Sequence, residues 1–195
     1  FLYYVEKRTD YVVLEAGIGG TLDSTNVIPG PECAVFTSIG LDHMKILGDT
    51  VEKIAQSKCG IIKGGEVVAV AGIPEPAMEV IRRQCERTGA HLTVPDETLI
   101  TLHGTPGLEG SSFRYKGQEY TLRMAGGFQV RNAVTAVEVL LGMGVSPANI
   151  AKGLARAQIP ARMEFFRPAG PDGLSVLLDG GHNPQAADAV RDALG

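Results

Sequence analysis

Residues 14–63 have the sequence LEAGIGGTLDSTNVIPGPECAVFTSIGLDHMKILGDTVEKIAQSKCGIIK, and this stretch decides the fold. The apolar runs YVVLEAG and CAVFTSIG have the length and composition of strands that are covered on both faces, as in a parallel sheet. Glu15 lies near the end of the first run, His43 follows the second, and the next segment predicts a helix that carries Lys58. Ligand-binding groups of α/β folds gather at the ends of such elements, so we expect the active site here.

The rest of the chain predicts an α/β fold in two parts. Strand and helix patterns alternate up to Pro95, which is typical of a mostly parallel sheet. The next segment, up to Met124, has short alternating runs with turn glycines and predicts a small antiparallel insertion. After two helical segments, Pro160 precedes a new strand, a PDG turn, a second strand and a helix. We therefore expect one domain over residues 1–160 and the start of a second over residues 161–195.

The composition is that of an ordinary globular protein, with 44% hydrophobic and 21% charged residues and a net charge of −4. Because no basic excess is present, we expect no nucleic-acid partner, and no apolar run approaches the roughly 18 residues of a membrane span. Three cysteines without a CxxC pair indicate a reducing compartment, so we expect a cytoplasmic protein. Both ends of the sequence have the pattern of interrupted helices, and we expect a fragment of a longer protein.

Each candidate residue also has a purely structural interpretation. Glu15 could accept N–H bonds from the glycine turn, His43 could be an ordinary structural histidine, and Lys58 could lie on a solvated helix face. The segment DGGHNP places Asp179 and His182 between a strand and the start of a helix, which is a natural anion site. The phosphate-binding sequence GxxxxGK[ST] does not occur in the chain.

Four segments, taken in order, resemble the folylpolyglutamate synthase and dihydrofolate synthase family of the Mur ligase superfamily. They are LEAGIGGTLDSTNVI, TSIGLDHMKILGDTVEKIAQSKCGIIK, GGFQVRNAVTA and LLDGGHNPQAA. The resemblance implies a Mur-ligase central ATPase domain over residues 1–160, and the start of a Rossmann-like glutamate ligase domain over residues 161–195. It also implies a reaction in which ATP activates a pterin or folate carboxylate as an acyl phosphate, which the amine of glutamate then attacks.

The resemblance assigns a role to ten residues. Lys58 matches a lysine that is carbamylated in the family, a change that turns an amine into an anionic oxygen ligand suited to Mg²⁺. Lys58, His43 and Arg162 are thereby implied to be catalytic. The implied binding groups are Glu15, His43 and Lys58 for Mg²⁺; Asp23, Thr25 and Asn26 for substrate; and Asn132, Arg162, Asp179 and His182 for ATP.

The chain departs from the family pattern at four positions without losing an implied ligand. Thr21 replaces a usual arginine, Ser57 a glutamate, Phe128 a histidine and Ala161 a glycine. The resemblance also implies that a P-loop and most of the C-terminal domain lie outside these 195 residues. We therefore expect the isolated chain to be inactive and to bind ATP weakly.

Two other functions remain open at this point. The chain could belong to another Mur-type ligase that acts on a cell-wall or amino-acid polymer substrate, although the LDSTN loop favours the folate branch. It could also be a non-catalytic binding domain. For the folate ligase the expected partners are folate or dihydropteroate, L-glutamate and ATP, and the full-length protein is expected to be a monomer.

Overall fold

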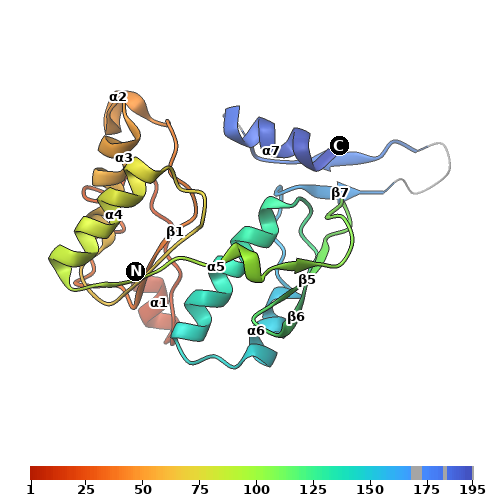
Figure 1. Cartoon of the computed structure of the whole chain (residues 1–195), viewed down its shortest axis with the longest axis horizontal. Coiled ribbons are helices and arrows are strands. Elements are labelled where there is room, and N and C mark those ends of the chain that lie inside the picture. Colours follow the sequence, from red (N-terminus) through yellow and green to blue (C-terminus); the bar gives the residue numbers. More distant parts are fainter. Residues whose placement is uncertain (168–172, 182–183, 195) are drawn as a thin grey trace. The chain divides into compact units, whose positions relative to one another are not determined.

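The structure is a computed structural model that describes residues 1–167, 173–181 and 184–194 (Figure 1). Its helices and strands form an α/β protein, which confirms the predicted fold class. The chain divides into two compact units, each built from several segments. Unit 1 comprises residues 1–34, 38–67 and 73–92, and unit 2 comprises residues 35–37, 68–72 and 93–195. The domain boundary expected near Pro160 stays a prediction.

A small parallel sheet has the strand order β1-β2-β3. Its strands are β1 (Cys33–Phe36), β2 (Glu66–Ala69) and β3 (His91–Thr93). The central strand β2 is buried over Val67, Val68 and Ala69, so that consecutive side chains on opposite faces are covered. This strand lies in the part of the chain, up to Pro95, where the sequence predicted alternating strands and helices.

The helices of unit 1 are α1 (Leu2–Lys7), α2 (Met44–Leu47), α3 (Val51–Lys58) and α4 (Glu75–Thr88). Helices α3 and α4 lie side by side (Figure 1). On α4, Ala77, Ile81 and Cys85 recur every four residues and are buried, which gives the helix one apolar face. Helix α3 begins after Thr50, whose side chain caps it by accepting the N–H of Lys53, and its end tightens into a 3₁₀ turn (Cys59–Ile61).

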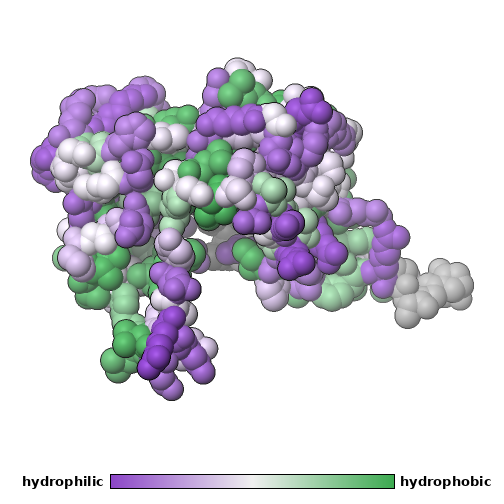
Figure 2. Space-filling model, turned by 90° about the horizontal axis from the view of Figure 1, so that it is seen from below, coloured by the Kyte–Doolittle hydropathy of each residue, from purple (hydrophilic) through white to green (hydrophobic). Residues whose placement is uncertain are grey.

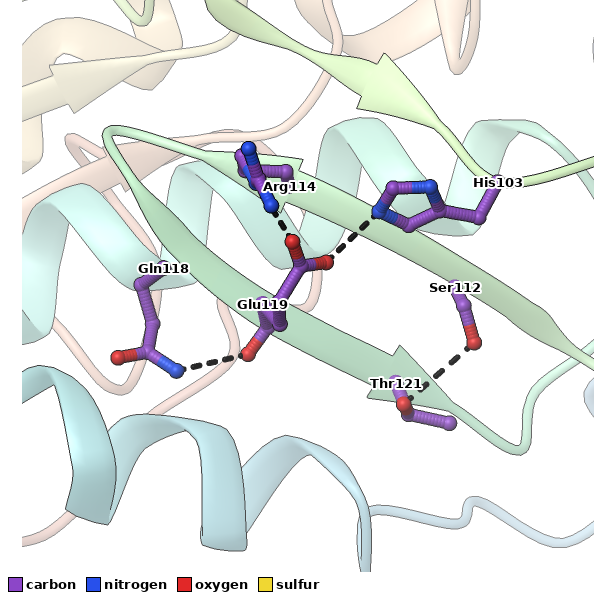
Figure 3. Close-up of polar contacts among 6 residues, drawn as sticks. All are labelled: His103, Ser112, Arg114, Gln118, Glu119 and Thr121. Carbon is purple, nitrogen blue, oxygen red and sulfur yellow. Dashed lines mark hydrogen bonds and ion pairs between the residues drawn. The ribbon is translucent and has the colours of Figure 1, made fainter.

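The antiparallel sheet of unit 2 has the order β4-β5-β6, as the sequence predicted. Its strands are β4 (Thr101–Leu102), β5 (Ser111–Tyr115) and β6 (Gln118–Leu122), after a 3₁₀ turn (Glu97–Leu99). Helices α5 (Phe128–Gly142) and α6 (Pro147–Leu154) pack against one face, where Phe113 and Tyr120 are buried and stack with centroids 5.4 Å apart. The other face is polar: His103 and Arg114 both contact the Glu119 carboxylate (Figure 3).

A second antiparallel pair in unit 2 is formed by β7 (Glu164–Phe166) and β8 (Val176–Leu178), and α7 (Pro184–Leu194) follows. Both strands and the helix were predicted from the sequence. The PDG turn expected between the strands falls mainly on residues outside the described ranges.

The strand predicted over YVVLEAG is wrong, because residues 11–16 have no regular secondary structure. The Val13 side chain is 96% exposed, and Tyr11 is exposed as well. A buried strand needs partners for its backbone N–H and C=O groups, and none of the described strands pairs with this segment. Helix α2 was not predicted, and the strand expected to reach Gly40 ends at Phe36.

Hydrophobic residues are mixed with hydrophilic ones on the surface in Figure 2. Several large apolar side chains are exposed in the first thirteen residues, including Leu2 and Val5 of α1. Among the described residues, no helix combines the length and the apolar character needed to cross a bilayer.

Candidate active site

The glycine-rich turn is joined to the end of helix α3 by side-chain and backbone hydrogen bonds. The backbone N–H and the hydroxyl of Thr21 both donate to the carbonyl oxygen of Ser57, at 2.8 and 3.0 Å. The Asn26 side-chain amide donates to the carbonyl oxygen of Gly60 at 3.1 Å. The Ser57 carbonyl, which also accepts a backbone N–H at the end of α3, thus accepts further bonds from the turn. Residues 17–26 and the segment that carries Lys58 therefore form one local structure within unit 1.

Two glycines allow the backbones of the turn and the helix end to approach this closely. A Cβ atom on Gly20 would lie only 2.5 Å from the carbonyl oxygen of Lys58. A Cβ atom on Gly60 would overlap with the backbone and the hydroxyl oxygen of Thr21. Because the atoms in the way belong largely to the backbone, a side chain at either position cannot be accommodated by a rotamer change.

Asp23 organises the glycine turn from within. Its Oδ2 accepts the N–H groups of Gly17 and Ile18 at 2.8 and 3.0 Å, and its Oδ1 accepts the N–H and the hydroxyl of Thr25 at 2.9 and 2.6 Å. These bonds, with that of the Thr25 hydroxyl largest, lower the pKa of the Asp23 carboxyl to about 2. A carboxylate has about four acceptor positions, and Asp23 uses all of them inside the loop.

Lys63 holds the far end of the loop and was not predicted as a site residue. Its ammonium donates to the carbonyl oxygens of Asn26 and Ile28. Lys63 ends the second segment that carries the family resemblance, but the resemblance implied no role for it, and the pattern does not show which carbonyl groups it contacts. Direct substrate binding by Asp23, Thr25 and Asn26 stays a prediction.

Lys58 is the last residue of α3 and is half-buried. Among the described residues its amine forms no ion pair or hydrogen bond, although its backbone borders Gly20. The amine therefore has no carboxylate partner of the kind that a half-buried lysine usually has.

Glu15 and His43 are both exposed members of unit 1. His43 precedes α2 in a left-handed conformation (φ 48°), and its N–H donates to the carboxylate of Asp42 at 2.7 Å. In the described part of the chain no hydrogen bond or ion pair joins Glu15 to His43. Their predicted role as a pair of metal ligands stays a prediction.

The residues implied to bind ATP lie in unit 2. Asn132 is exposed on α5, and its amide donates to the Gln129 side chain at 3.1 Å. Arg162 is exposed in the turn before β7, and Asp179 accepts the N–H of Met163 at 2.9 Å. The structure thus joins Asp179 to the turn of Arg162, while His182 lies outside the described residues.

The Mur ligase middle domain family model matches residues 1–140. The chain belongs to the Mur ligase middle domain family. Membership confirms the superfamily predicted from the glycine turn and the Lys58 helix, which both lie within the matched range.

Two curated relatives within the Mur ligase superfamily cover the whole chain. The dihydrofolate synthase/folylpolyglutamate synthase of Bacillus subtilis is 34% identical over 208 residues, and the folylpolyglutamate synthase of Lacticaseibacillus casei is 32% identical over 209 residues. In both cases the alignment covers 100% of this chain and 47% of the relative. The chain therefore spans about half the length of the curated relatives it matches, and the resemblance to the folate branch is confirmed.

Solved structures of folate-branch Mur ligases have the same fold as this chain. The apo form of the L. casei folylpolyglutamate synthase superposes with a TM-score of 0.82, and an FPGS–AMPPCP–folate complex with a TM-score of 0.83. Each is 31% identical in sequence, and each comparison covers 98% of this chain and 48% of the solved chain.

Proposed function

We propose that this chain is part of an ATP-dependent ligase that joins L-glutamate to folate or dihydropteroate. The observation that carries the proposal is the glycine turn bonded to the end of α3, which combines both folate-type sequence signatures in one local structure. Similarity over the whole chain to folylpolyglutamate and dihydrofolate synthases supports it, as does the likeness to a complex with AMPPCP and folate.

The proposed reaction has two steps. An oxygen of the acceptor carboxylate attacks the γ-phosphorus of ATP, and ADP leaves. The amine nitrogen of glutamate then attacks the acyl carbon and loses a proton, and phosphate leaves with one of the original carboxylate oxygens. Catalysis of phosphoryl transfer rests on positioned charge, so the role of Arg162 would be to offset negative charge on the phosphates.

The adenine and the acceptor would be bound by neutral polar groups. Asn132 has an exposed amide that can pair with the adenine ring, and its bond to Gln129 fixes its rotamer. The hydroxyl of Thr25 and the amide of Asn26 are held by Asp23 and Gly60, so that any contact they make with the acceptor would be preorganised.

Magnesium fits the donor chemistry of unit 1. Mg²⁺ takes one or two protein carboxylates and keeps waters and substrate phosphates as its other ligands. Glu15 offers a carboxylate that forms no ion pair in the described structure, and no group of three or more His, Cys, Asp or Glu side chains in that structure could hold a metal ion by itself. Lys58 can act as a ligand only as a carbamate, because an ammonium group has no acceptor. When bound, Mg²⁺ would offset the charge of the ATP phosphates.

The reducing-compartment pattern of the cysteines and the small-molecule substrates support a cytoplasmic enzyme. Cys59 and Cys85 are buried, and none of the three cysteines forms a disulfide in the described structure. We infer that the complete enzyme acts as a monomer, with folate or dihydropteroate, L-glutamate and ATP as its partners.

Glutamate ligation by the complete enzyme tests this function. Labelled L-glutamate would be incubated with ATP, Mg²⁺ and either dihydropteroate or tetrahydrofolate, with a nucleotide-linked cell-wall peptide precursor as the control acceptor. We expect ATP-dependent incorporation of label into a pterin acceptor and none into the control. Incorporation into the cell-wall precursor alone would contradict the proposal and favour another Mur-type ligase.

A further inference from the structure

Unit 2 contains a cavity of about 230 Å³ that is flanked by two arginines far apart in the sequence. Arg123 follows strand β6, and Arg162 lies in the turn before β7. Gln158 adds a side-chain amide, and apolar side chains that include Met124 and Phe165 form much of the remaining wall.

Neither guanidinium at this cavity has an anionic partner in the described part of the chain. Some arginines outside it have such a partner: Arg114, Arg131 and Arg191 each form an ion pair with a carboxylate, whereas Arg156 forms none in the described structure. The one carboxylate that lines the cavity, Glu164, accepts the backbone N–H of Ala161 at 3.0 Å and does not pair with either arginine. Two guanidinium groups without anionic partners at one cavity leave their N–H donors available to an anionic ligand.

The turn that presents Arg162 is held in an unusual conformation. Ala161 and Met163, on either side of Arg162, are both left-handed, with φ of 58° and 50°. The Asp179 carboxylate accepts the N–H of Met163 at 2.9 Å, and the N–H of Gly180 donates to the Ala161 carbonyl at 2.8 Å. Non-glycine residues persist in this region when the surroundings fix them, as happens at ligand clamps. The backbone is thus arranged to keep Arg162 at the cavity.

We propose that this cavity is an oxyanion subsite in which Arg123 binds the ligand together with Arg162. Arg123 carries no motif and was not a candidate in the sequence. A guanidinium binds phosphate or carboxylate oxygens through two parallel N–H bonds, and two such groups with the Gln158 amide match a polyoxygen anion. The assignment of the ligand rests on the proposed ligase function: the bound anion is either the phosphate chain of ATP or the carboxylates of glutamate.

Substitution of Arg123 in the complete enzyme tests the subsite. Arg123→Gln removes the charge, and Arg156→Gln is the matched control, because Arg156 is also an exposed arginine of unit 2 but does not line the cavity. Dissociation constants for AMPPCP and for inorganic triphosphate would be measured by calorimetry, and the KM for glutamate by initial rates. We expect Arg123→Gln to weaken the binding of one ligand class about tenfold or more, because it loses a charge-assisted hydrogen bond. The control Arg156→Gln should change each dissociation constant and the KM less than about twofold.

The pattern of losses identifies the ligand. A loss confined to AMPPCP and triphosphate assigns the subsite to phosphate, and a loss confined to the KM for glutamate assigns it to carboxylate. If neither the dissociation constants for AMPPCP and triphosphate nor the KM for glutamate change, the proposed subsite is wrong, even if ligation itself proceeds. Triphosphate binding that depends on Arg123 in an enzyme without glutamate ligation would instead preserve the subsite and refute the proposed function.

A second variant covers the case in which Arg123→Gln does not fold. Arg123→Lys keeps the charge but cannot form two parallel bonds, so it should weaken the affected ligand severalfold. Wild-type affinity in the lysine variant would overturn the two-bond contact.

Discussion

At the scale of single residues, the predicted site residues Asp23 and Lys58 differ in whether their side chains have hydrogen-bond partners. Substrate binding by Asp23 stays a prediction, and its acceptor positions are used by Gly17, Ile18 and Thr25 within the loop. Lys58 is half-buried, and its amine pairs with no carboxylate in the described structure. Residue type and position could be predicted for both, whereas the hydrogen-bond partners depend on a loop conformation that the sequence pattern does not specify.

The stability supplied by Asp23 should depend on pH. Its folded-state pKa is about 2, below the ordinary value of 3.8, so the charged form stabilises the loop above about pH 4 and this contribution is lost as the pH falls toward 2. We expect Asp23→Asn to be less stable than wild type in urea unfolding at pH 4 to 8, and the difference to shrink below pH 4. The control Asp10→Asn, at an exposed residue without side-chain bonds in the described structure, should show no such trend. A difference that stays constant down to pH 2 would refute the assignment.

Turnover should require an anionic group at position 58. We expect Lys58→Ala to lower glutamate ligation at least about 100-fold, and a short carboxylate such as acetate to restore part of it, since a metal-site group is removed and then replaced. Lys58→Arg keeps the positive charge and should stay inactive. Lys53→Ala, on the exposed side of the same helix, is the control and should keep near-wild-type rates. A fully active Lys58→Arg enzyme would exclude a carbamate.

At the scale of elements, short-range sequence signals mark the ends of helices, because helix ends are determined by a few neighbouring residues. Thr50 before α3, the left-handed Gly89 after α4, and Pro147 at the start of α6 are residue types that mark helix ends in a sequence. The segment over residues 11–16 was predicted wrongly, because an apolar run specifies a strand only if another strand pairs with it. The contact between the glycine turn and α3 could not be predicted either, since it joins residues that are more than thirty positions apart.

Close backbone contact at Gly20 should be intolerant of a side chain. We expect Gly20→Ala to lower the free energy of unfolding by about 1–3 kcal/mol and to reduce ligation, because its Cβ must displace the Lys58 carbonyl. Gly30→Ala is the matched control, since nothing lies within 4 Å of a Cβ there. Urea unfolding and initial rates would measure both effects. Equal behaviour of the two variants would refute the close contact.

The buried contact between Tyr115 and Glu138 should stabilise unit 2 more than the exposed contacts of Glu119 on the antiparallel sheet do. The Tyr115 hydroxyl donates to Glu138 at 2.5 Å, and burial together with this carboxylate raises the pKa of Tyr115. Lys116 pairs with the same carboxylate at 2.6 Å. We expect Glu138→Ala to lower the free energy of unfolding by about 2 kcal/mol or more, because a buried hydroxyl loses its partner.

The exposed carboxylate Glu119 in Figure 3 provides the comparison for Glu138. Its contacts with Arg114 and His103 are solvated, so Glu119→Ala should cost less than about 1 kcal/mol in the same urea experiment. A larger loss for Glu119→Ala than for Glu138→Ala would contradict this ranking.

At the scale of the whole molecule, the candidate groups are divided between the two units. Glu15, His43 and Lys58 belong to unit 1, and Asn132 and Arg162 belong to unit 2. The family was predicted from the sequence and is confirmed. The sequence pattern could not identify Arg123 as a site residue. The cavity is formed by the end of β6 and the turn before β7, and only the tertiary structure places these two segments side by side.

The transfer of carboxylate oxygen to phosphate tests the central claim most directly. Dihydropteroate or folate labelled with oxygen-18 in its acceptor carboxylate would be converted by the complete enzyme with ATP and L-glutamate, and the released phosphate analysed by mass spectrometry. If the ligase activates its acceptor as an acyl phosphate, each phosphate released will carry one labelled oxygen, matched one to one with the glutamylated product. Glutamylated product accompanied by unlabelled phosphate would contradict the account.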